Sequence, residues 1–338
     1  MSLFAQKNIS YHNLEENMWN DRIASRDLAI GIIFISQTIV GILGNFSLLY
    51  HYLFLYYTEG RLRPTDLILK HLVLANALIV LSKGVPQTMA AFGLKHFFSD
   101  SGCRFLLYVQ RVGRGVSIST TCLLSVFQAI TISPVNSCWK DLKVKAPKYI
   151  GFSISLCWIL YIFVNITFPM YVLSLSGRWG SKNTRLKKEL RHCSYIDDVE
   201  IIASLYAALI VFPEISFTGL MLWASGSMVL ILHRHKQRVQ HIHSTNVSPR
   251  SSAKSRATQG ILVLGSTFVC FYFLSSTFHV CVALFHNPSW WLVNMTALIS
   301  VCFPTLSPYL PMSRDSSSSR LCLMWIRNTK SPHLSRNM

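Results

Sequence analysis

Residues 28–52 have the sequence LAIGIIFISQTIVGILGNFSLLYHY and contain no aspartate, glutamate, lysine or arginine. A helix that crosses the hydrocarbon layer of a bilayer needs about 20 predominantly apolar residues. No water is present in that layer, so a spanning segment must satisfy its backbone N–H and C=O groups internally, as a helix does. This stretch therefore predicts a membrane-spanning helix.

The same pattern recurs six more times along the chain. The further apolar stretches are residues 66–92, 103–132, 149–172, 201–232, 258–285 and 289–311. Membrane β-strands are about 10 residues long and alternate in polarity, so these longer and more uniform stretches favour helices. The sequence predicts an all-α, seven-transmembrane-helix bundle at residues 28–311, with tails at 1–27 and 312–338.

The composition agrees with a membrane protein. Hydrophobic residues make up 51% of the 338 residues, charged residues only 14%, and the mean hydropathy is +0.37. Soluble domains contain about 25% charged residues on average. The net charge of +18 first suggests a nucleic-acid binder, but a soluble chain this apolar would need more charged residues on its surface. Disordered chains are poor in apolar residues, so this composition disfavours that class as well.

The distribution of basic residues predicts the orientation of the bundle. Seven crossings place the two termini on opposite sides of the membrane. With the N-terminus outside, 17 lysines and arginines lie on the cytoplasmic side and 10 lie outside. Cytoplasmic loops are enriched in Lys and Arg, so we expect an extracellular N-terminus and a cytoplasmic C-terminus. The basic outer segment 178–191 runs against this rule and has no explanation in the sequence.

Two cysteines fall on the predicted oxidising side, where disulfides form. Cys103 begins the third helix, and Cys193 lies in the second outer loop, so a disulfide could tie the loop to the helix; the alternative is two free thiols. The Asn-x-Ser/Thr sequons at Asn8, in the tail, and Asn165, near the outer end of helix four, are candidate glycosylation sites. Asn165 lies close to the lipid.

Seven local strings, taken in order, resemble one receptor family. They are LRPTDLILKHLVLAN (62–76), RVGRGVSISTTCLLSVFQAITISP (111–134), LWASGSMV (222–229), HKQRVQHIHS (235–244), SRATQ (255–259), NPSWWLVN (287–294) and CFPTLSP (302–308). Each string is weak alone, but the ordered set is specific. From about residue 28 to 325 the chain is similar to the vomeronasal type-1 receptors, the mammalian pheromone receptors within the G-protein-coupled receptor superfamily.

Several positions depart from the wider rhodopsin-like pattern. Asn76 stands where most such receptors place a sodium-binding Asp, and Ser307-Pro308 stands in place of Asn-Pro. Phe127-Gln128-Ala129 replaces Asp-Arg-Tyr, and residues 271–276 lack the usual Trp-x-Pro. The resemblance therefore does not transfer the usual switch chemistry to this chain.

The resemblance implies a multi-pass plasma-membrane receptor for a small pheromone-like ligand that binds from outside. It also implies a heterotrimeric G protein of the Gi/Go class as the cytoplasmic partner, with no cofactor, metal or nucleic acid. The residues expected to face the G protein are Gln128, Arg234, Lys236, Arg238 and Arg256. No catalytic set is visible in the sequence, so we expect no enzymatic activity.

Charges inside predicted helices mark a candidate site, because such charges usually face a cavity or a partner. Arg111 and Arg114 are spaced i, i+3 on helix three, and Glu214, beside Pro213, is the one carboxylate well inside a helix. One hypothesis is that an arginine binds a polar or anionic group of the ligand. The other is that an arginine pairs permanently with Glu214 and joins helices three and five. Lys70 and Lys83 are expected to snorkel or to face the bundle.

Two other functions remain open from the sequence. A seven-helix transporter or channel is expected to show repeated halves, broken helices or a line of carboxylates. Glu214 is a single carboxylate, which argues against this class. The second alternative is a receptor-like protein that does not signal. The His-x-His units of residues 233–243 could bind a metal, but a basic helix end beside anionic lipid is the favoured interpretation.

Overall fold

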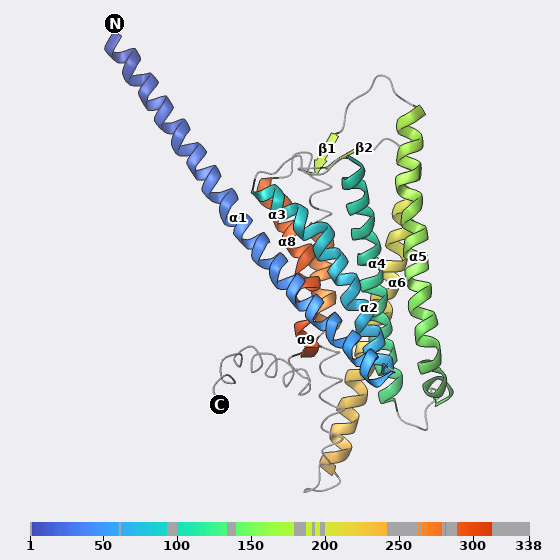
Figure 1. Ribbon diagram of the computed structural model, residues 1–338. Coiled ribbons are helices and arrows are strands. Elements are labelled where there is room, and N and C mark those ends of the chain that lie inside the picture. The colour runs from blue at the N-terminus through green and yellow to red at the C-terminus, as the bar shows by residue number, and fades with distance from the viewer. Residues whose placement is uncertain are drawn as a thin grey trace, which may run out of the picture.

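The computed structural model describes residues 2–60, 62–92, 100–133, 140–178, 187–190, 193–196, 200–241, 263, 265–278, 281 and 289–312, and the side chains of most of them. These residues form the predicted bundle of long helices, with one short hairpin at one end (Figure 1). The long helices are α1 (Ser2–Glu59), α2 (Pro64–Ile79), α4 (Asp100–Ile132), α5 (Lys140–Arg178), α6 (Glu200–His241) and α8 (Trp290–Leu306). Residues 265–278 form a further helical segment between α6 and α8.

Five of the described helical stretches are long and apolar enough to cross a membrane. They are Leu28–Thr58, Pro64–Ala90, Ser101–Ile132, Lys143–Ile166 and Phe212–Ile231. The apolar helix α8 is shorter and is followed by α9 (Tyr309–Met312). With the segment 265–278, these elements correspond in order to the seven predicted helices. The all-helical transmembrane architecture predicted from hydropathy is thus confirmed.

The first helix is much longer than its apolar stretch. We predicted a helix at 28–52, whereas α1 runs from Ser2 to Glu59. Residues 2–27 contain no proline or glycine that would interrupt a helix, although they are polar. At the other end, Gly60 adopts φ +67°, a left-handed conformation that glycine favours, and its N–H donates to the Tyr56 carbonyl at 3.1 Å. The helix therefore ends at the residue before Gly60, which adopts the left-handed conformation.

Helix two changes its winding in the middle. It begins with Pro64 at its first turn, continues through the π-helical turn η1 (Val80–Gly84), and ends as α3 (Val85–Ala91). Pro86, in the first turn of α3, has no N–H to donate to a preceding carbonyl. A single π turn inside an α-helix is uncommon and is frequent at functional sites. The π turn contains Lys83.

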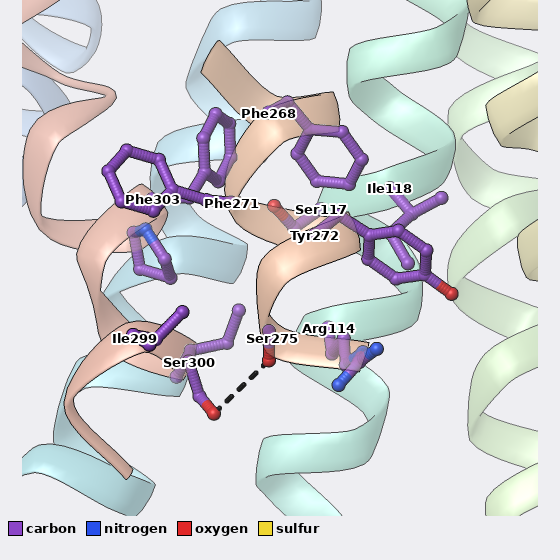
Figure 2. A pocket seen from close by; sticks show the side chains of 12 residues that line it. Arg114, Ser117, Ile118, Phe268, Phe271, Tyr272, Ser275, Ile299, Ser300 and Phe303 are labelled. Carbon is purple, nitrogen blue, oxygen red and sulfur yellow. Dashed lines mark hydrogen bonds between the residues drawn. The ribbon is translucent and has the colours of Figure 1, made fainter. Parts of the chain in front are cut away.

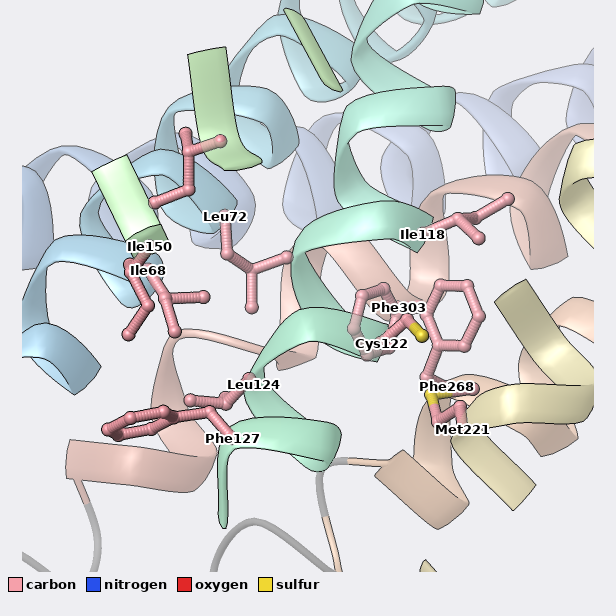
Figure 3. Close-up of a cluster of buried hydrophobic side chains, with 11 residues drawn as sticks. Ile68, Leu72, Ile118, Cys122, Leu124, Phe127, Ile150, Met221, Phe268 and Phe303 are labelled. Atoms are coloured by element: carbon pink, nitrogen blue, oxygen red, sulfur yellow. The ribbon is translucent and has the colours of Figure 1, made fainter. Parts of the chain in front are cut away.

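The core is built around α4, which packs against α2, α5 and α6. Figure 3 shows its largest buried cluster, in which Ile118, Cys122 and Leu124 of α4 lie among side chains of neighbouring helices. Four buried hydroxyl residues of α4 donate to carbonyls three or four residues earlier in the same helix; they are Ser119, Thr120, Thr121 and Ser125. Because their hydroxyls are paired inside the helix, these residues can be buried without a partner on another helix.

The outward surface of the bundle is apolar. Phe152 and Phe163 on α5 and Phe212 on α6 are among many large hydrophobic side chains that are more than half exposed. In water such surfaces would be unfavourable, whereas lipid is as apolar as the side chains themselves. The exposed faces of α1, α5 and α6 therefore suit contact with lipid.

One hairpin lies at the end of the bundle toward which the N-terminal part of α1 extends (Figure 1). Strands β1 (Lys187–Leu190) and β2 (Cys193–Ile196) pair antiparallel, with Leu190 opposite Cys193. Sequence patterning did not predict these strands, of which β1 lies in the basic segment 178–191 and β2 follows it. β2 contacts α4, so the hairpin lies beside the start of the central helix.

Candidate ligand-binding site

The two central charges of the bundle pair across helices. Nε of Arg114 on α4 lies 3.4 Å from Oε1 of Glu214 on α6, and Nη2 donates to Oε2 at 3.5 Å. Glu214 is buried, whereas the Arg114 side chain remains 32% exposed. Glu214 thus covers Arg114 only in part.

Tyr272 completes this cluster from a third helix. Its hydroxyl donates to Oε2 of Glu214, and its ring centroid lies 5.0 Å from the guanidinium carbon of Arg114. A cation over an aromatic ring is attracted by the negative face of the ring. The triad Arg114–Glu214–Tyr272 therefore joins α4, α6 and the segment 265–278. Sequence reasoning missed Tyr272, because the string containing it was compared only with the absent Trp-x-Pro.

A small pocket opens beside the triad, with a cavity volume of about 50 Å³. Phe268, Phe271 and Phe303 form much of its wall, and Ser275 and Ser300 contribute hydroxyls that lie 3.3 Å apart (Figure 2). Arg114 and Tyr272, two members of the triad, also line the pocket. Mostly apolar walls with a few polar groups are typical of sites for small molecules.

Directly next to the pocket lies a neutral hydrogen-bond network. Ser117, which lines the pocket, donates to Oδ1 of Asn76 at 2.8 Å, and Nδ2 of Asn76 donates to Ser307 at 2.6 Å. Asn76 is fully buried, and the network links α2, α4 and the end of α8. Amide and hydroxyl groups satisfy one another here without an ion.

Asn45 on α1 extends the polar centre of the bundle. Its Nδ2 donates to the carbonyls of Gly41 and Pro304, at 2.8 and 2.9 Å. The second of these bonds joins α1 to α8. Asn45 thus connects two helices in the structure.

The other predicted contact residues lie in different places. Arg111 is on α4, three residues before Arg114, and is not among the residues that line the pocket. Gln128 is partly exposed near the opposite end of α4, and Arg234 is exposed on α6. Lys236 and Arg238 also belong to α6, but their side chains are not among those that the structure describes. Arg256 lies entirely outside the described residues.

The structure tests only some of the cysteine and glycosylation predictions. Cys103 is buried at the start of α4 and is disulfide-bonded. The side chain of Cys193 lies outside the described residues, so their pairing stays a prediction. Asn165 is buried, and its Nδ2 donates to the Tyr161 carbonyl at 2.8 Å. A glycan needs this nitrogen exposed, so the geometry disfavours modification of Asn165. Asn8 lies in α1, with its side chain undescribed.

Comparison with known proteins places this chain in a receptor family. The model of the vomeronasal organ pheromone receptor family matches residues 28–324. The chain is 57% identical over 305 residues to vomeronasal type-1 receptor 4 of Homo sapiens, which covers 90% of this chain and 100% of that protein. It is 42% identical over 315 residues to vomeronasal type-1 receptor 1 of Homo sapiens, covering 93% and 88% respectively.

A solved structure shows the same fold at low sequence identity. The crystal structure of squid rhodopsin matches with a TM-score of 0.65 and 15% identity, covering 90% of this chain and 82% of that one. The family match and the rhodopsin-like helices together indicate a multi-pass plasma-membrane receptor of the G-protein-coupled class, not an enzyme. The chain belongs to the vomeronasal organ pheromone receptor family, whose members include the vomeronasal type-1 receptors.

Proposed function

We propose that this receptor detects a small, largely apolar pheromone-like molecule, which enters from outside and binds in the pocket beside Arg114. Binding shifts a pre-existing equilibrium toward a state that engages a heterotrimeric G protein of the Gi/Go class. The N-terminus is extracellular and the C-terminus cytoplasmic in this proposal. The observation that carries it is the pocket itself, where aromatic walls meet a charged triad that joins three helices.

The pocket is well placed to affect helix positions. Phe268, Phe271 and Tyr272 lie on the segment 265–278, while Arg114 and Ile118 come from α4. A ligand that contacts both α4 and the segment 265–278 stabilises the relative position of these two elements in which it binds more tightly. Ligands can shift an equilibrium only through such differences in affinity between the two states.

The cytoplasmic partner surface is proposed from charge and position. Arg234 is exposed near the C-terminal end of α6. That end of α6 projects from the bundle on the side opposite the hairpin (Figure 1). We assign Gln128, Arg234, Lys236, Arg238 and Arg256 to this surface. Basic side chains on it suit both anionic lipid and an acidic protein partner.

Two phenylalanines provide a matched test of the ligand site. Phe271 lines the pocket, whereas Phe273, two residues later, is 72% exposed on the outer surface. Cells that express the full chain with Gi or Go are screened with a panel of small apolar molecules, and second-messenger responses are recorded. We expect Phe271→Ala to reduce potency by about tenfold or more, since a buried aromatic contact contributes over 1.4 kcal/mol. Phe273→Ala should respond as the unchanged receptor does.

The same cells test the G-protein surface and can contradict the proposal. Arg234→Glu should weaken the response without changing ligand affinity in a binding assay. Equal losses for Phe271→Ala and Phe273→Ala, at equal surface expression, would place the ligand elsewhere. A response that persists after Gi and Go are inactivated would refute the proposed coupling.

A further inference from the structure

The pocket has an apolar end and a polar end (Figure 2). Three phenylalanines surround the apolar end; they are Phe268, Phe271 and Phe303. Arg114, Ser275 and Ser300 lie at the polar end. A cavity of about 50 Å³ holds about three or four water molecules, so it fits the polar end of a small molecule. A longer apolar part enters only when the phenylalanine side chains move apart.

Two hydroxyl groups of the pocket have given their hydrogens to the protein. A hydroxyl carries one hydrogen and two lone pairs. Ser117 donates its hydrogen to Oδ1 of Asn76, and Tyr272 donates its hydrogen to Oε2 of Glu214. Neither of these bonds can run the other way, because an amide oxygen and an ionised carboxylate carry no hydrogen. Toward a ligand, these two hydroxyls can therefore only accept.

Ser300 is in the same condition at the polar end. Its Oγ donates to the Thr296 carbonyl, four residues earlier in α8, at 2.5 Å. Oγ of Ser275 lies 3.3 Å from Oγ of Ser300. Because the hydrogen of Ser300 already points at the Thr296 carbonyl, Ser275 is the donor in this contact. Ser300 therefore has no hydrogen to offer a ligand, but its second lone pair can accept one.

We propose that the ligand is an alcohol whose hydroxyl group donates a hydrogen bond to Oγ of Ser300. A ligand with only an acceptor, such as a ketone, would place its lone pairs against those of Ser300 once water is displaced from this end of the pocket. Leaving a buried polar group without its partner costs more than a hydrogen bond contributes on average. The carbons of the alcohol then lie toward the phenylalanines.

This inference depends on the proposed function for the location of the ligand. It adds the chemical class of the ligand's polar group, and it makes Ser300 a specificity-determining residue. The aromatic walls alone would accept an alcohol and a ketone of the same skeleton about equally well.

Two probes with one carbon skeleton test the preference. The full chain is purified in detergent, and its thermal midpoint is measured over a range of concentrations of cyclopentanol and of cyclopentanone. Cyclopentanol should bind about fivefold more tightly, which corresponds to about 1 kcal/mol, the net contribution of one hydrogen bond.

Substitutions at two serines assign this preference to a residue. Ser300→Ala should bind the alcohol and the ketone equally. Ser216→Ala is the matched control, because the Ser216 hydroxyl also donates to the carbonyl four residues earlier, at 2.8 Å, but is exposed on α6. The control should keep the fivefold preference. Alanine favours the helix, and the preference is a ratio measured within each variant, so a change in stability alone does not alter it.

Three results would overturn this proposal. They are equal binding of the two probes by the unchanged chain, no midpoint shift with either probe at its solubility limit, and a preference that survives Ser300→Ala. The binding measurement contains no G protein. An alcohol preference that depends on Ser300, together with absent G-protein activation, would therefore refute the proposed function and leave the hydroxyl site intact. Ligand responses that depend on Phe271 but not on Ser300 would do the reverse.

Discussion

Glu214 shows how one buried carboxylate can stabilise two neighbours at once. It accepts hydrogen bonds from Arg114 and Tyr272, which come from different helices. Without the negative charge of Glu214, the partly buried guanidinium of Arg114 would lose the carboxylate that pairs with it. Removing one partner of a buried ion pair costs more than the pair contributes, because the other charge remains desolvated.

A prediction at the residue scale concerns this carboxylate. Glu214→Gln should destabilise the fold by about 1–3 kcal/mol, less than for a fully buried pair because Arg114 is partly exposed. Tyr272→Phe should cost less, since it removes a single hydrogen bond. Thermal midpoints and surface expression of both variants provide the measurement. No loss for Glu214→Gln would show that the charge of Glu214 contributes nothing.

At the scale of elements, the contact between α4 and α5 depends on a glycine. A Cβ added at Gly115 would overlap the ring of Tyr161, which is 3% exposed. Tyr161 is large and fully enclosed, so it has little room to move aside. Gly115 therefore allows the two helices to approach closely at this level, as small residues do between membrane helices.

Two glycine-to-alanine substitutions separate this packing effect from helix propensity. Gly115→Ala should destabilise the protein by about 1–3 kcal/mol, because overpacking forces side chains and backbone to shift. Gly151→Ala, on α5, meets no atom within 4 Å and should be neutral or stabilising by up to about 1 kcal/mol. Thermal unfolding in detergent measures both. A neutral result for Gly115→Ala would mean that Tyr161 moves freely.

Hydropathy predicted where the helices meet lipid but not where they end. The stretches 28–52 and 149–172 lie inside α1, Ser2–Glu59, and α5, Lys140–Arg178. Where a helix continues from lipid into water, its residues become polar but its backbone hydrogen bonds continue. Hydropathy therefore marks the end of the apolar stretch and not the end of the helix. The end at Gly60 comes from a backbone angle, and the π turn η1 comes from local winding before Pro86. Neither has a clear signal in hydropathy.

The candidate site was predictable only in part, for a related reason. Arg114 and Glu214 stood out in the sequence because charges are rare in apolar stretches. Tyr272 did not stand out, because an aromatic residue in an apolar helix is not unusual, and its role depends on the rotation of that helix about its axis. Which of Arg111 and Arg114 meets Glu214 depends on the same kind of rotation, and the structure supplies it.

At the scale of the whole molecule, Ser117 connects the pocket with the polar centre. It lines the pocket and donates to Asn76, which in turn donates to Ser307. A change in the pocket can thus reach the far end of α8 through two hydrogen bonds. All three groups are neutral, so the connection does not depend on a bound ion.

Asn76→Asp tests this independence from ions. The variant places a carboxylate beside two hydroxyl groups, a set of oxygen ligands suited to a small cation. Its thermal midpoint should be higher in sodium chloride than in choline chloride, whereas the unchanged receptor should unfold at the same temperature in both salts. Equal behaviour of the variant in the two salts would show that no cation reaches this position.

The hydroxyl groups of α4 have a consequence for motion. Ser119, Thr120, Thr121 and Ser125 bond to carbonyls of their own helix, so these bonds travel with the helix when it moves. A small rotation or translation of α4 against α2 and α6 leaves all four intact. The polar contacts that such a displacement strains most directly are those of Arg114 and Ser117, and both residues line the pocket. The interhelical hydrogen bonds of α4 that such a shift changes thus lie beside the pocket, where the ligand is proposed to act.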